Sequence, residues 1–458
     1  MVEKLRKTLA DSAIARWGVL VAVSLTMMCG YFLTDAIAPL KSLLEKSVED
    51  GGLGWTSTDF GQFNGGYGWL NVILLMMIVG GIILDKKGAR FTGLFSIIIM
   101  FIGAVIKYYA IAYIAPTDDT IFGLKYQVAV AAVGYAIFAF GYETVNITAT
   151  KLLVRWFHGK EMALALGMNV AFARLGTMLA MGAPLRIVEW TGSISAPILF
   201  GTVLLLLGVL TFLVVVLMDK KLDKQISLQP TTTGDDEKFR MNDILSIIKM
   251  RGFWFIAILC LVFYISIMTF QKYGVQFIGM KFSMSETSAG DLLMLLPVGA
   301  LFLTPAFGGV YDKIGRGATM MILGCVLIIV VYALFSIPAI TSTFAAISIV
   351  ILLGIAFSLV PSAMWPSVAK IIPQQKLGTA YALIFWVQNI GLAGAPIAIG
   401  WILDAYCSLG ANEQGDMQYD YQLPMLIFMG LGAVALVFGL LLKRENRIKG
   451  YGLEDPNM

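Results

Sequence analysis

Charged residues are scarce in this chain, at 14% of its 458 residues, whereas hydrophobic residues make up 58%. A soluble domain of this length carries more charge on its surface, so the composition excludes an ordinary soluble protein and favours one that has lipid as its solvent. The formal net charge of +4 needs no nucleic-acid partner, because a small excess of basic residues is typical of membrane proteins anchored at the inner leaflet.

Residues that bind metals or form disulfides are also few. Cys29, Cys260, Cys325 and Cys407 are scattered without metal-ligand spacing, so neither zinc nor a disulfide framework is expected. The single histidine, His158, is expected to be a solvated residue of a cytoplasmic turn and not a proton relay. Motifs of zinc hydrolases and nucleophile elbows are missing, which argues against an enzyme. No metal and no organic cofactor are expected.

Apolar runs of about 20 residues, enough to cross a hydrocarbon core of about 30 Å, recur along the whole chain. Because backbone polar groups must be satisfied within lipid and the alternation of a membrane barrel is absent, these runs predict helices. The fold class expected is therefore an all-α membrane protein with about twelve transmembrane helices. The predicted spans are 17–40, 59–84, 91–114, 127–151, 161–186, 195–218, 253–280, 287–311, 318–338, 342–369, 377–403 and 422–442.

A repeated motif divides the chain into two halves of six helices each. Gly81 and the residues after it, through Arg90, are partly repeated from Gly308 to Arg316, each after the second span of its half. The predicted units are an amino-terminal half at 1–218, a cytoplasmic linker at 219–252, and a carboxy-terminal half with a cytoplasmic tail at 253–458. The last part of the linker, 239–250, has the spacing of an amphipathic helix lying on the membrane surface.

The distribution of basic residues predicts the orientation. Most lysines and arginines lie at the amino terminus, in the connections on its side of the membrane and in the tail, so both termini are expected in the cytoplasm. The exceptions, within spans or beyond their outer ends, are Lys41, Lys46, Lys107, Lys125, Arg174, Arg186, Lys272 and Lys281.

The repeated motif resembles the loop signature of the major facilitator superfamily. A glycine allows two helices to approach closely, and the acidic residue can lie against the positive end of a neighbouring helix, expected near Gly378, and pair with arginine. The alternative is a simple tight turn with anchoring charges. The expected function is a conformational latch formed by Gly81, Asp85, Lys86, Gly88, Arg90, Gly308, Asp312, Gly315 and Arg316.

Longer stretches resemble the lysosomal dipeptide transporter branch of that superfamily, as a bacterial relative would. They include 30–39, 69–71, 141–161, 173–176 and 365–392. The resemblance implies transport of dipeptides, with Glu143 and Arg174 holding the peptide termini. The chain departs from the family pattern around Lys272, and it lacks the Glu-x-x-Glu-Arg motif of proton-coupled oligopeptide transporters.

Depth in the membrane also selects Glu143 and Arg174. Both lie equally far from the turn at His158, so an antiparallel pair of helices places them at one level, roughly 20 Å from the cytoplasmic end. A carboxylate and a guanidinium at that level can receive the ammonium and the carboxylate of a zwitterion. The alternative is a structural ion pair that only joins two helices.

Other charged and polar residues are predicted near the same cavity. Lys107 is expected to extend its long side chain to the outer headgroups, whereas Asp35 and Lys272 are candidates for an outward vestibule. The complete predicted substrate site is Glu143, Arg174, Tyr31, Asp35, Tyr67, Asn71, Lys272, Trp365 and Asn389.

The function predicted from these observations is a secondary transporter that moves dipeptides by alternating access and facilitated diffusion. It is expected to be a monomer in a bacterial inner membrane, with the lipid bilayer and a small zwitterion as partners. Two rivals share the fold: a carboxylate or amino-acid exchanger and a proton-coupled symporter. A rival of another class is a receptor or accessory subunit that does not transport.

Overall fold

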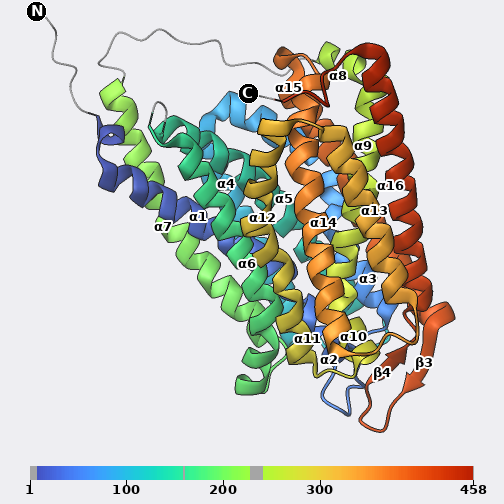
Figure 1. Ribbon diagram of the computed structural model, residues 1–458. Coiled ribbons are helices and arrows are strands. Elements are labelled where there is room, and N and C mark those ends of the chain that lie inside the picture. The colour runs from blue at the N-terminus through green and yellow to red at the C-terminus, as the bar shows by residue number, and fades with distance from the viewer. Residues whose placement is uncertain (1–7, 158–159, 227–240, 457–458) are drawn as a thin grey trace, which may run out of the picture.

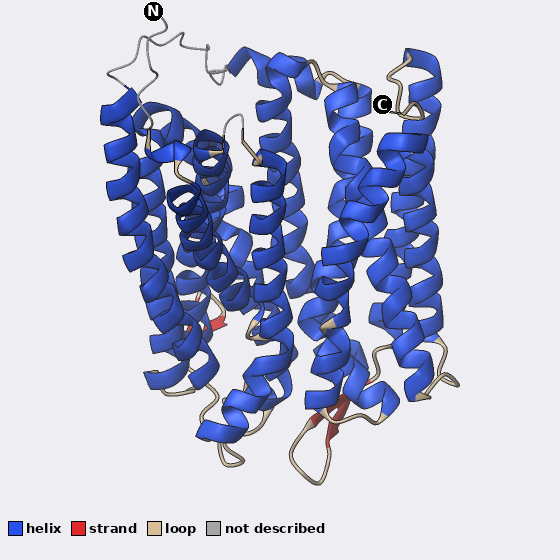
Figure 2. Ribbon diagram, turned by 60° about the vertical axis from the view of Figure 1, so that its left-hand side comes forward, coloured by secondary structure: helices blue, strands red, loops and turns tan. Residues whose placement is uncertain are grey.

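The computed structural model describes residues 8–157, 160–226 and 241–456 (Figure 1). Nearly all of this part is helical, and the strands are confined to two short hairpins, as the colouring by secondary structure shows (Figure 2). Eleven helices are long and apolar enough to span a membrane, or up to twelve when a bent pair counts as one span. The predicted all-α membrane fold is confirmed.

The amino-terminal half consists of helices that the apolar runs predict, with a small hairpin between its third and fourth spans. Its elements are η1 (Leu9–Asp11), α1 (Ala13–Asp35), η2 (Ala38–Leu40), α2 (Lys41–Glu45), α3 (Ser57–Ile73), α4 (Met76–Tyr113), β1 (Thr120–Ile121), β2 (Leu124–Lys125), α5 (Tyr126–Trp156), α6 (Met162–Thr191) and α7 (Ala196–Ile226).

The carboxy-terminal half repeats this arrangement, with a hairpin before its last span. After α8 (Met241–Ile248) of the linker, its elements are α9 (Arg251–Tyr264), η3 (Ile265–Thr269), α10 (Phe270–Phe282), α11 (Glu286–Leu293), α12 (Leu295–Ile314), α13 (Gly317–Ser336), α14 (Thr343–Ile371), η4 (Gln374–Lys376), α15 (Leu377–Ile402), η5 (Leu403–Cys407), β3 (Ser408–Ala411), β4 (Met417–Tyr419) and α16 (Gln422–Lys449).

The second span differs from the straight helix expected over 59–84. It consists of Ser57–Ile73 and Ile78–Leu84, which meet at a bend of 58°. Leu75, at the break, has a left-handed φ of 50°, a conformation that costs free energy for a bulky residue. The indole of Trp386 on α15 donates a hydrogen bond of 3.1 Å to the carbonyl of Val72. A side chain of the other half thus satisfies a backbone group next to the break.

The linker is more helical than expected. Helix α7 continues to Ile226, and α8 begins at Met241 in the segment predicted to be amphipathic. In α8, Ile247 is buried and Leu245 is 63% exposed, and Ser246 accepts a hydrogen bond from Lys376 at the start of the eleventh span. Residues 227–240 of the linker, and the turn at His158, lie outside the described residues.

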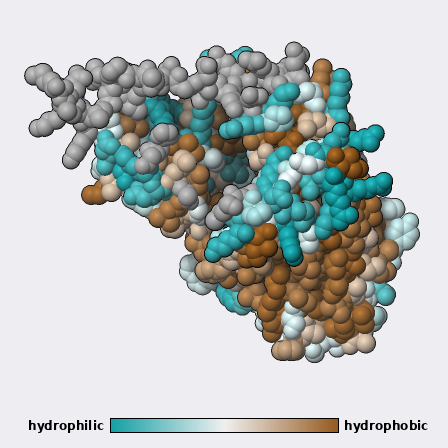
Figure 3. Space-filling model, turned by 45° about the horizontal axis from the view of Figure 1, so that its top comes forward, coloured by the Kyte–Doolittle hydropathy of each residue, from teal (hydrophilic) through white to brown (hydrophobic). Residues whose placement is uncertain are grey.

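The lateral surface is apolar, as lipid requires. On α7, Leu207, Leu210, Val214 and Leu217 are each at least half exposed and recur with helical spacing on one face. Figure 3 shows hydrophobic residues over the side of the molecule and hydrophilic ones gathered at the end that carries the chain termini. The hairpin β3–β4 lies at the opposite end (Figure 1). The chain is therefore an integral multi-pass membrane protein.

Candidate functional site

Glu143 on α5 is half-buried and surrounded by tyrosines. Its carboxylate accepts a short hydrogen bond from the hydroxyl of Tyr67 on α3. The rings of Tyr67 and Tyr142 lie 6.4 Å apart, and Tyr142 in turn packs edge-on against Tyr31 of α1 at 5.3 Å. Helix α3 reaches this position because Gly66 has no side chain: a Cβ there would lie 2.8 Å from the carbonyl oxygen of Ala132 on α5.

Arg174 on α6 faces the other half of the molecule. Its guanidinium carbon lies 5.1 Å from the ring centroid of Phe357 on α14, a distance typical of a cation–π interaction. The approach of α6 to α1 depends on Gly176, where a Cβ would lie 2.3 Å from the carbonyl oxygen of Met28 and 2.9 Å from Cβ of Tyr31. Arg174 and Tyr31 are therefore on helices in close contact.

Glu143 and Arg174 do not neutralise each other. Among the described side chains, neither is a member of an ion pair. The alternative to a substrate clamp was a structural ion pair between these two residues, and they do not form one in this structure. Glu143 has Tyr67 as its partner and Arg174 has Phe357. Both charges remain available for a ligand, which is what a clamp for a zwitterion requires.

Two predicted amide residues have unused hydrogen-bonding capacity. The side-chain nitrogen of Asn71 donates to the carbonyl of Tyr67 at 3.3 Å, and that of Asn389 on α15 donates to the carbonyl of Phe385 at 2.9 Å. Their Oδ1 atoms are buried and have no hydrogen-bond partner among the described residues. A buried carbonyl without a donor costs free energy, so each is suited to accept a hydrogen bond from a bound ligand.

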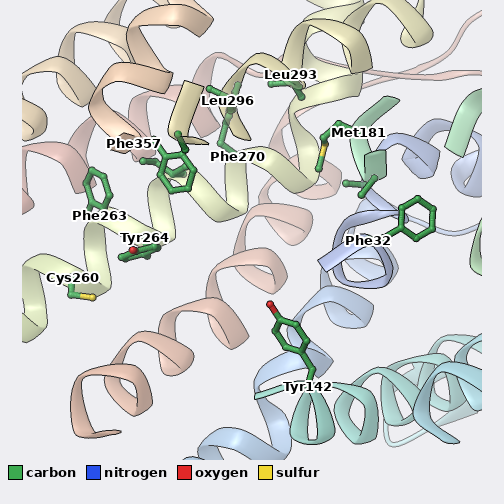
Figure 4. Packing of buried hydrophobic residues seen from close by; sticks show 14 of the residues in the cluster. Phe32, Tyr142, Met181, Cys260, Phe263, Tyr264, Phe270, Leu293, Leu296 and Phe357 are labelled. Carbon is green, nitrogen blue, oxygen red and sulfur yellow. The ribbon is translucent and has the colours of Figure 1, made fainter. Parts of the chain in front are cut away.

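Trp365 lies among aromatic residues of the carboxy-terminal half. Its ring stacks on Phe385 at 4.8 Å and approaches Tyr381 at 5.9 Å. Figure 4 shows Tyr264 and Phe357 of this half, and Tyr142 of the other, among the buried side chains near the interface between the halves. Sequence reasoning missed Tyr142 and Phe357, which contact candidate site residues, because an aromatic residue in an apolar span carries no signal that separates packing from ligand contact.

Asp35 and Lys272, both predicted to line an outward vestibule, pair with each other. The ammonium of Lys272 on α10 lies 2.7 Å from the carboxylate of Asp35 and donates a second bond of 2.7 Å to the carbonyl of Thr34. The two side chains are each 12% exposed. In this state the pair joins the two halves, and neither residue is free to bind a substrate.

The prediction that Lys107 extends to the outer headgroups is wrong. Lys107 is 1% exposed, and its ammonium donates a 2.7 Å hydrogen bond to the carbonyl of Leu33. The rings of Tyr135 and Phe138 lie 5.0 and 5.1 Å from the same nitrogen. The carbonyls at the end of α1 lie closer to the Lys107 ammonium than the membrane surface does. The two aromatic rings take the place of the water that this ammonium loses on burial.

The first signature loop contacts α7. Gly88 has a φ of 77° and makes the turn between the second and third spans. Arg90 lies 3.9 Å from Asp219 and also pairs with Asp223, and Arg155 pairs with the same two carboxylates. A Cβ at Gly81 or at Gly378 would meet nothing within 4 Å, and Lys86 is exposed. The side chain of Asp85 lies outside the described residues.

The second signature loop is covered by the carboxy-terminal tail. Arg316 and Gly317 donate backbone hydrogen bonds to the carbonyls of Glu454 and Leu453, at 3.0 and 2.8 Å. The carboxylate of Glu454 caps the first turn of α13, where Thr319 donates to it from both its backbone nitrogen and its hydroxyl. A Cβ at Gly315 would lie 2.4 Å from the carbonyl oxygen of Glu454. Gly308 has open space around its Cβ position, and Asp312 is partly buried.

Polar contacts close the halves together at the end remote from the termini. Arg186 on α6 forms a bidentate ion pair with Asp291 on α11, at 2.8 and 2.7 Å. Asp404 on η5 accepts hydrogen bonds from the backbone nitrogens of Ser57 and Thr58, at 3.1 and 2.6 Å, and so caps α3 from the other half.

A buried network adds to this closure. Lys41 lies 2.5 Å from Glu45 of its own half and 2.6 Å from Gln276 of the other half, and Gln276 donates to Glu45 at 2.7 Å. Sequence reasoning placed Lys41 at an outer span end but did not identify this network. Lys41 and Glu45 have the i,i+4 spacing of a helical ion pair, but no local pattern links them to Gln276 of the other half.

Comparisons with known proteins agree with this architecture. The sequence profile described as Major Facilitator Superfamily matches residues 12–396 and 273–453. The chain is 29% identical over 394 residues to a zebrafish (Danio rerio) protein called lysosomal dipeptide transporter MFSD1, covering 82% of this chain and 77% of that protein. For the human (Homo sapiens) protein of the same name, the identity is 24% over 400 residues, covering 83% and 79%.

A solved structure has the same fold at low sequence identity. The crystal structure of a bacterial homologue of the human lysosomal transporter Spinster, described as inward-facing and unoccupied, superposes with a TM-score of 0.68. The identity is 14%, and the match covers 94% of this chain and 98% of that one. At this identity the likeness concerns the fold alone.

Proposed function

The chain belongs to the major facilitator superfamily, and from that premise we propose that it moves dipeptides across a membrane by alternating access, as a facilitator without a coupled ion. The class of protein, a secondary membrane transporter and not an enzyme, follows from the family. The substrate is the proposal. It is supported by the distant identity to proteins named as dipeptide transporters and by the arrangement of Glu143 and Arg174.

The observation that carries the proposal is that Glu143 and Arg174 are oppositely charged and not paired to each other. Glu143 is positioned by Tyr67 and Arg174 by Phe357. An isolated charge within a membrane span is costly, by about 2.5–3.5 kcal/mol on insertion scales. A zwitterionic ligand offsets both costs together, with its ammonium at Glu143 and its carboxylate in the guanidinium fork of Arg174.

The polar amides supply the rest of the proposed contact. The unpartnered Oδ1 atoms of Asn71 and Asn389 are acceptors suited to the N–H of a peptide bond. Trp365 and Phe385 form an aromatic wall for a substrate side chain. Because only termini and backbone are read by polar groups, the proposed site accepts many side chains.

The mechanism proposed is rocking of residues 1–218 against 253–442 around this site, with 219–252 as the linker. Inter-half contacts at Arg186 and Asp404 close the end remote from the termini in this state. We further propose that both termini face the cytoplasm of a bacterial cell, because basic residues concentrate at that end. The state described is then closed to the outside.

The test is a thermal-shift screen of the purified protein with dipeptides, tripeptides, free amino acids and dicarboxylates, since a ligand that binds only the folded state raises the apparent Tm. Several dipeptides should raise the Tm, and the shift should vanish in Glu143→Gln and Arg174→Lys. Arg174→Lys keeps the charge but loses the bidentate fork. A full shift in that variant contradicts the clamp.

The same experiment separates the rival functions. Stabilisation by dicarboxylates alone assigns the protein to anion exchange. If dipeptides stabilise the protein, uptake into liposomes with and without a pH gradient distinguishes a facilitator from a proton symporter. A facilitator accumulates dipeptide only to the external concentration in both conditions.

A further inference from the structure

Helix α1 ends at Asp35, within the first candidate span, Ala13–Glu45, and two lysines donate hydrogen bonds to its last carbonyls. A helix end leaves carbonyl groups without intrahelical partners and carries the negative end of the helix dipole. Lys107 donates to the carbonyl of Leu33 and Lys272 to that of Thr34, both at 2.7 Å. Asp35, the last residue of α1, pairs with Lys272.

The cluster thus holds two cations and one carboxylate, and the two cations belong to different halves. Lys107 on α4 and Asp35 on α1 belong to the amino-terminal half, whereas Lys272 lies on α10 of the other half. Lys107 and Lys272 donate to the carbonyls of consecutive residues, Leu33 and Thr34, so both ammonium groups lie at the end of α1 that Asp35 terminates. The hydroxyl of Tyr135, also of the amino-terminal half, donates to the carbonyl of Thr34 at 2.8 Å.

The bond between Asp35 and Lys272 has to break during alternating access. Opening the end remote from the termini carries α10 away from α1, so Lys272 leaves with its own half. Lys107 stays, because its ammonium is held by Leu33 and by the rings of Tyr135 and Phe138, all in the same half as Asp35.

We propose that Asp35, Lys107 and Lys272 form a charge-exchange gate, in which Asp35 pairs with Lys272 when this end is closed and with Lys107 when it is open. The gate rests on the alternating-access part of the proposed function and not on the identity of the substrate. In this gate Lys107 is the counter-ion of Asp35 that stays in the same half. Among the described residues, Lys107 forms no other ion pair that would explain a buried lysine.

In both states the charge of Lys107 shifts the equilibrium between closed and open towards the open state. With the gate closed, Lys107 repels Lys272 and weakens the closed state. With the gate open, Lys107 compensates the carboxylate of Asp35 in a site of low dielectric, where an unpaired charge is costly. Removing the charge of Lys107 therefore favours closure, and removing that of Lys272 favours opening.

The experiment measures the distance between spin labels on the two halves by double electron–electron resonance, in nanodiscs and without substrate. Trp190 and Phe344 are 87% and 79% exposed at this end of α6 and α14. Labels are attached through Trp190→Cys and Phe344→Cys. The four native cysteines are buried, which limits background labelling.

Lys107→Gln should increase the short-distance population relative to the long one by roughly fivefold or more, the scale of coupling between partly buried charges. Lys272→Met should shift the ratio in the opposite direction by a similar factor, and the double variant should lie between them. The glutamine amide can still donate to Leu33, which limits damage to folding. If the closed state already dominates, the Lys107 effect is read in the Lys272→Met background.

Lys125→Met is the matched control. Lys125 lies at the same end, donates to the carbonyl of Gly54 at 2.7 Å and pairs with Asp59 at 3.4 Å, all within the amino-terminal half. Its loss should leave the distance ratio unchanged.

The gate is overturned if Lys107→Gln leaves the ratio unchanged in both backgrounds or shifts it towards opening, and equally if Lys272→Met does not favour opening. Because no substrate is present, these outcomes are independent of the thermal-shift screen. A gate that behaves as expected in a protein that no dipeptide stabilises would leave the inference standing and remove the dipeptide proposal.

Discussion

The guanidinium of Arg174 lies over the ring of Phe357, 5.1 Å from its centroid, and this contact crosses from one half of the protein to the other. In the proposed function, this neutral ring orients Arg174, and a substrate carboxylate can bind the N–H groups of the guanidinium without displacing another charge.

Replacing Phe357 tests whether this ring positions Arg174. Phe357→Leu should weaken dipeptide binding roughly five- to thirtyfold, because a cation–π contact contributes about 1–2 kcal/mol in a partly or fully desolvated site. Phe357→Tyr should keep the contact and the affinity. Isothermal titration with the dipeptide that gives the largest thermal shift measures both. Phe335→Leu, which removes another buried ring of the same half, should not change binding. Equal losses in Phe357→Leu and Phe335→Leu would show that general packing is responsible.

Removing the hydroxyl of Tyr67 tests the orientation of Glu143. Tyr67→Phe deletes the hydrogen bond to the carboxylate, and a hydrogen bond to a charged group contributes about 1.5–3 kcal/mol. The dipeptide Kd should rise roughly ten- to hundredfold while the protein remains folded. Tyr332→Phe is the control, since its hydroxyl donates to the carbonyl of Ser266 away from this site. An unchanged Kd in Tyr67→Phe means that Glu143 does not need this partner.

The cap that Asp404 places on α3 should stabilise closure at the end remote from the termini. Asp404→Ala removes a helix cap supplied by the other half, and an N-cap contributes about 0.5–2 kcal/mol. Labels on Trp190→Cys and Phe344→Cys should report about a fivefold increase in the open population. Asp59 also caps α3, but from its own half, through the backbone nitrogen of Thr56. Asp59→Ala should therefore lower the Tm without moving the distance ratio, and a shift as large as that of Asp404→Ala would refute the cross-half cap.

Gly315 should be the glycine of the second signature loop that tolerates substitution least. Its φ is 74°, and a Cβ would meet the carbonyl oxygen of Glu454 at 2.4 Å. Gly315→Ala should cost about 1–3 kcal/mol of strain and expose the tail to carboxypeptidase. Gly308→Ala, in α12 with open space around it, should be neutral or slightly stabilising. Thermal unfolding and limited proteolysis of both variants check this, and a neutral Gly315→Ala would mean that the tail does not pack on the loop as described.

The spans, their number and their division into halves were within reach of the sequence, because each span is a local run whose apolar composition is imposed by lipid. Glu143 and Arg174, which we propose hold the substrate, were also selected from local sequence, since a charge within an apolar run is rare whatever surrounds it. The bend at Leu75 was not, because no proline or glycine marks it and the satisfying donor, Trp386, comes from the other half.

The partners of the charges were decided by tertiary structure alone. The sequence determined that Asp35, Lys107 and Lys272 would lie in spans at some cost. It did not determine that one end of α1 would collect all three, which made Lys107 a buried residue and not one that reaches the headgroups. Ion pairs, caps and cation–π contacts between halves join residues far apart in the chain, as Arg174 and Phe357 do. These contacts form only when the two folded halves pack against each other. Hydropathy is a property of each span by itself, so it carries no information about the contacts between halves.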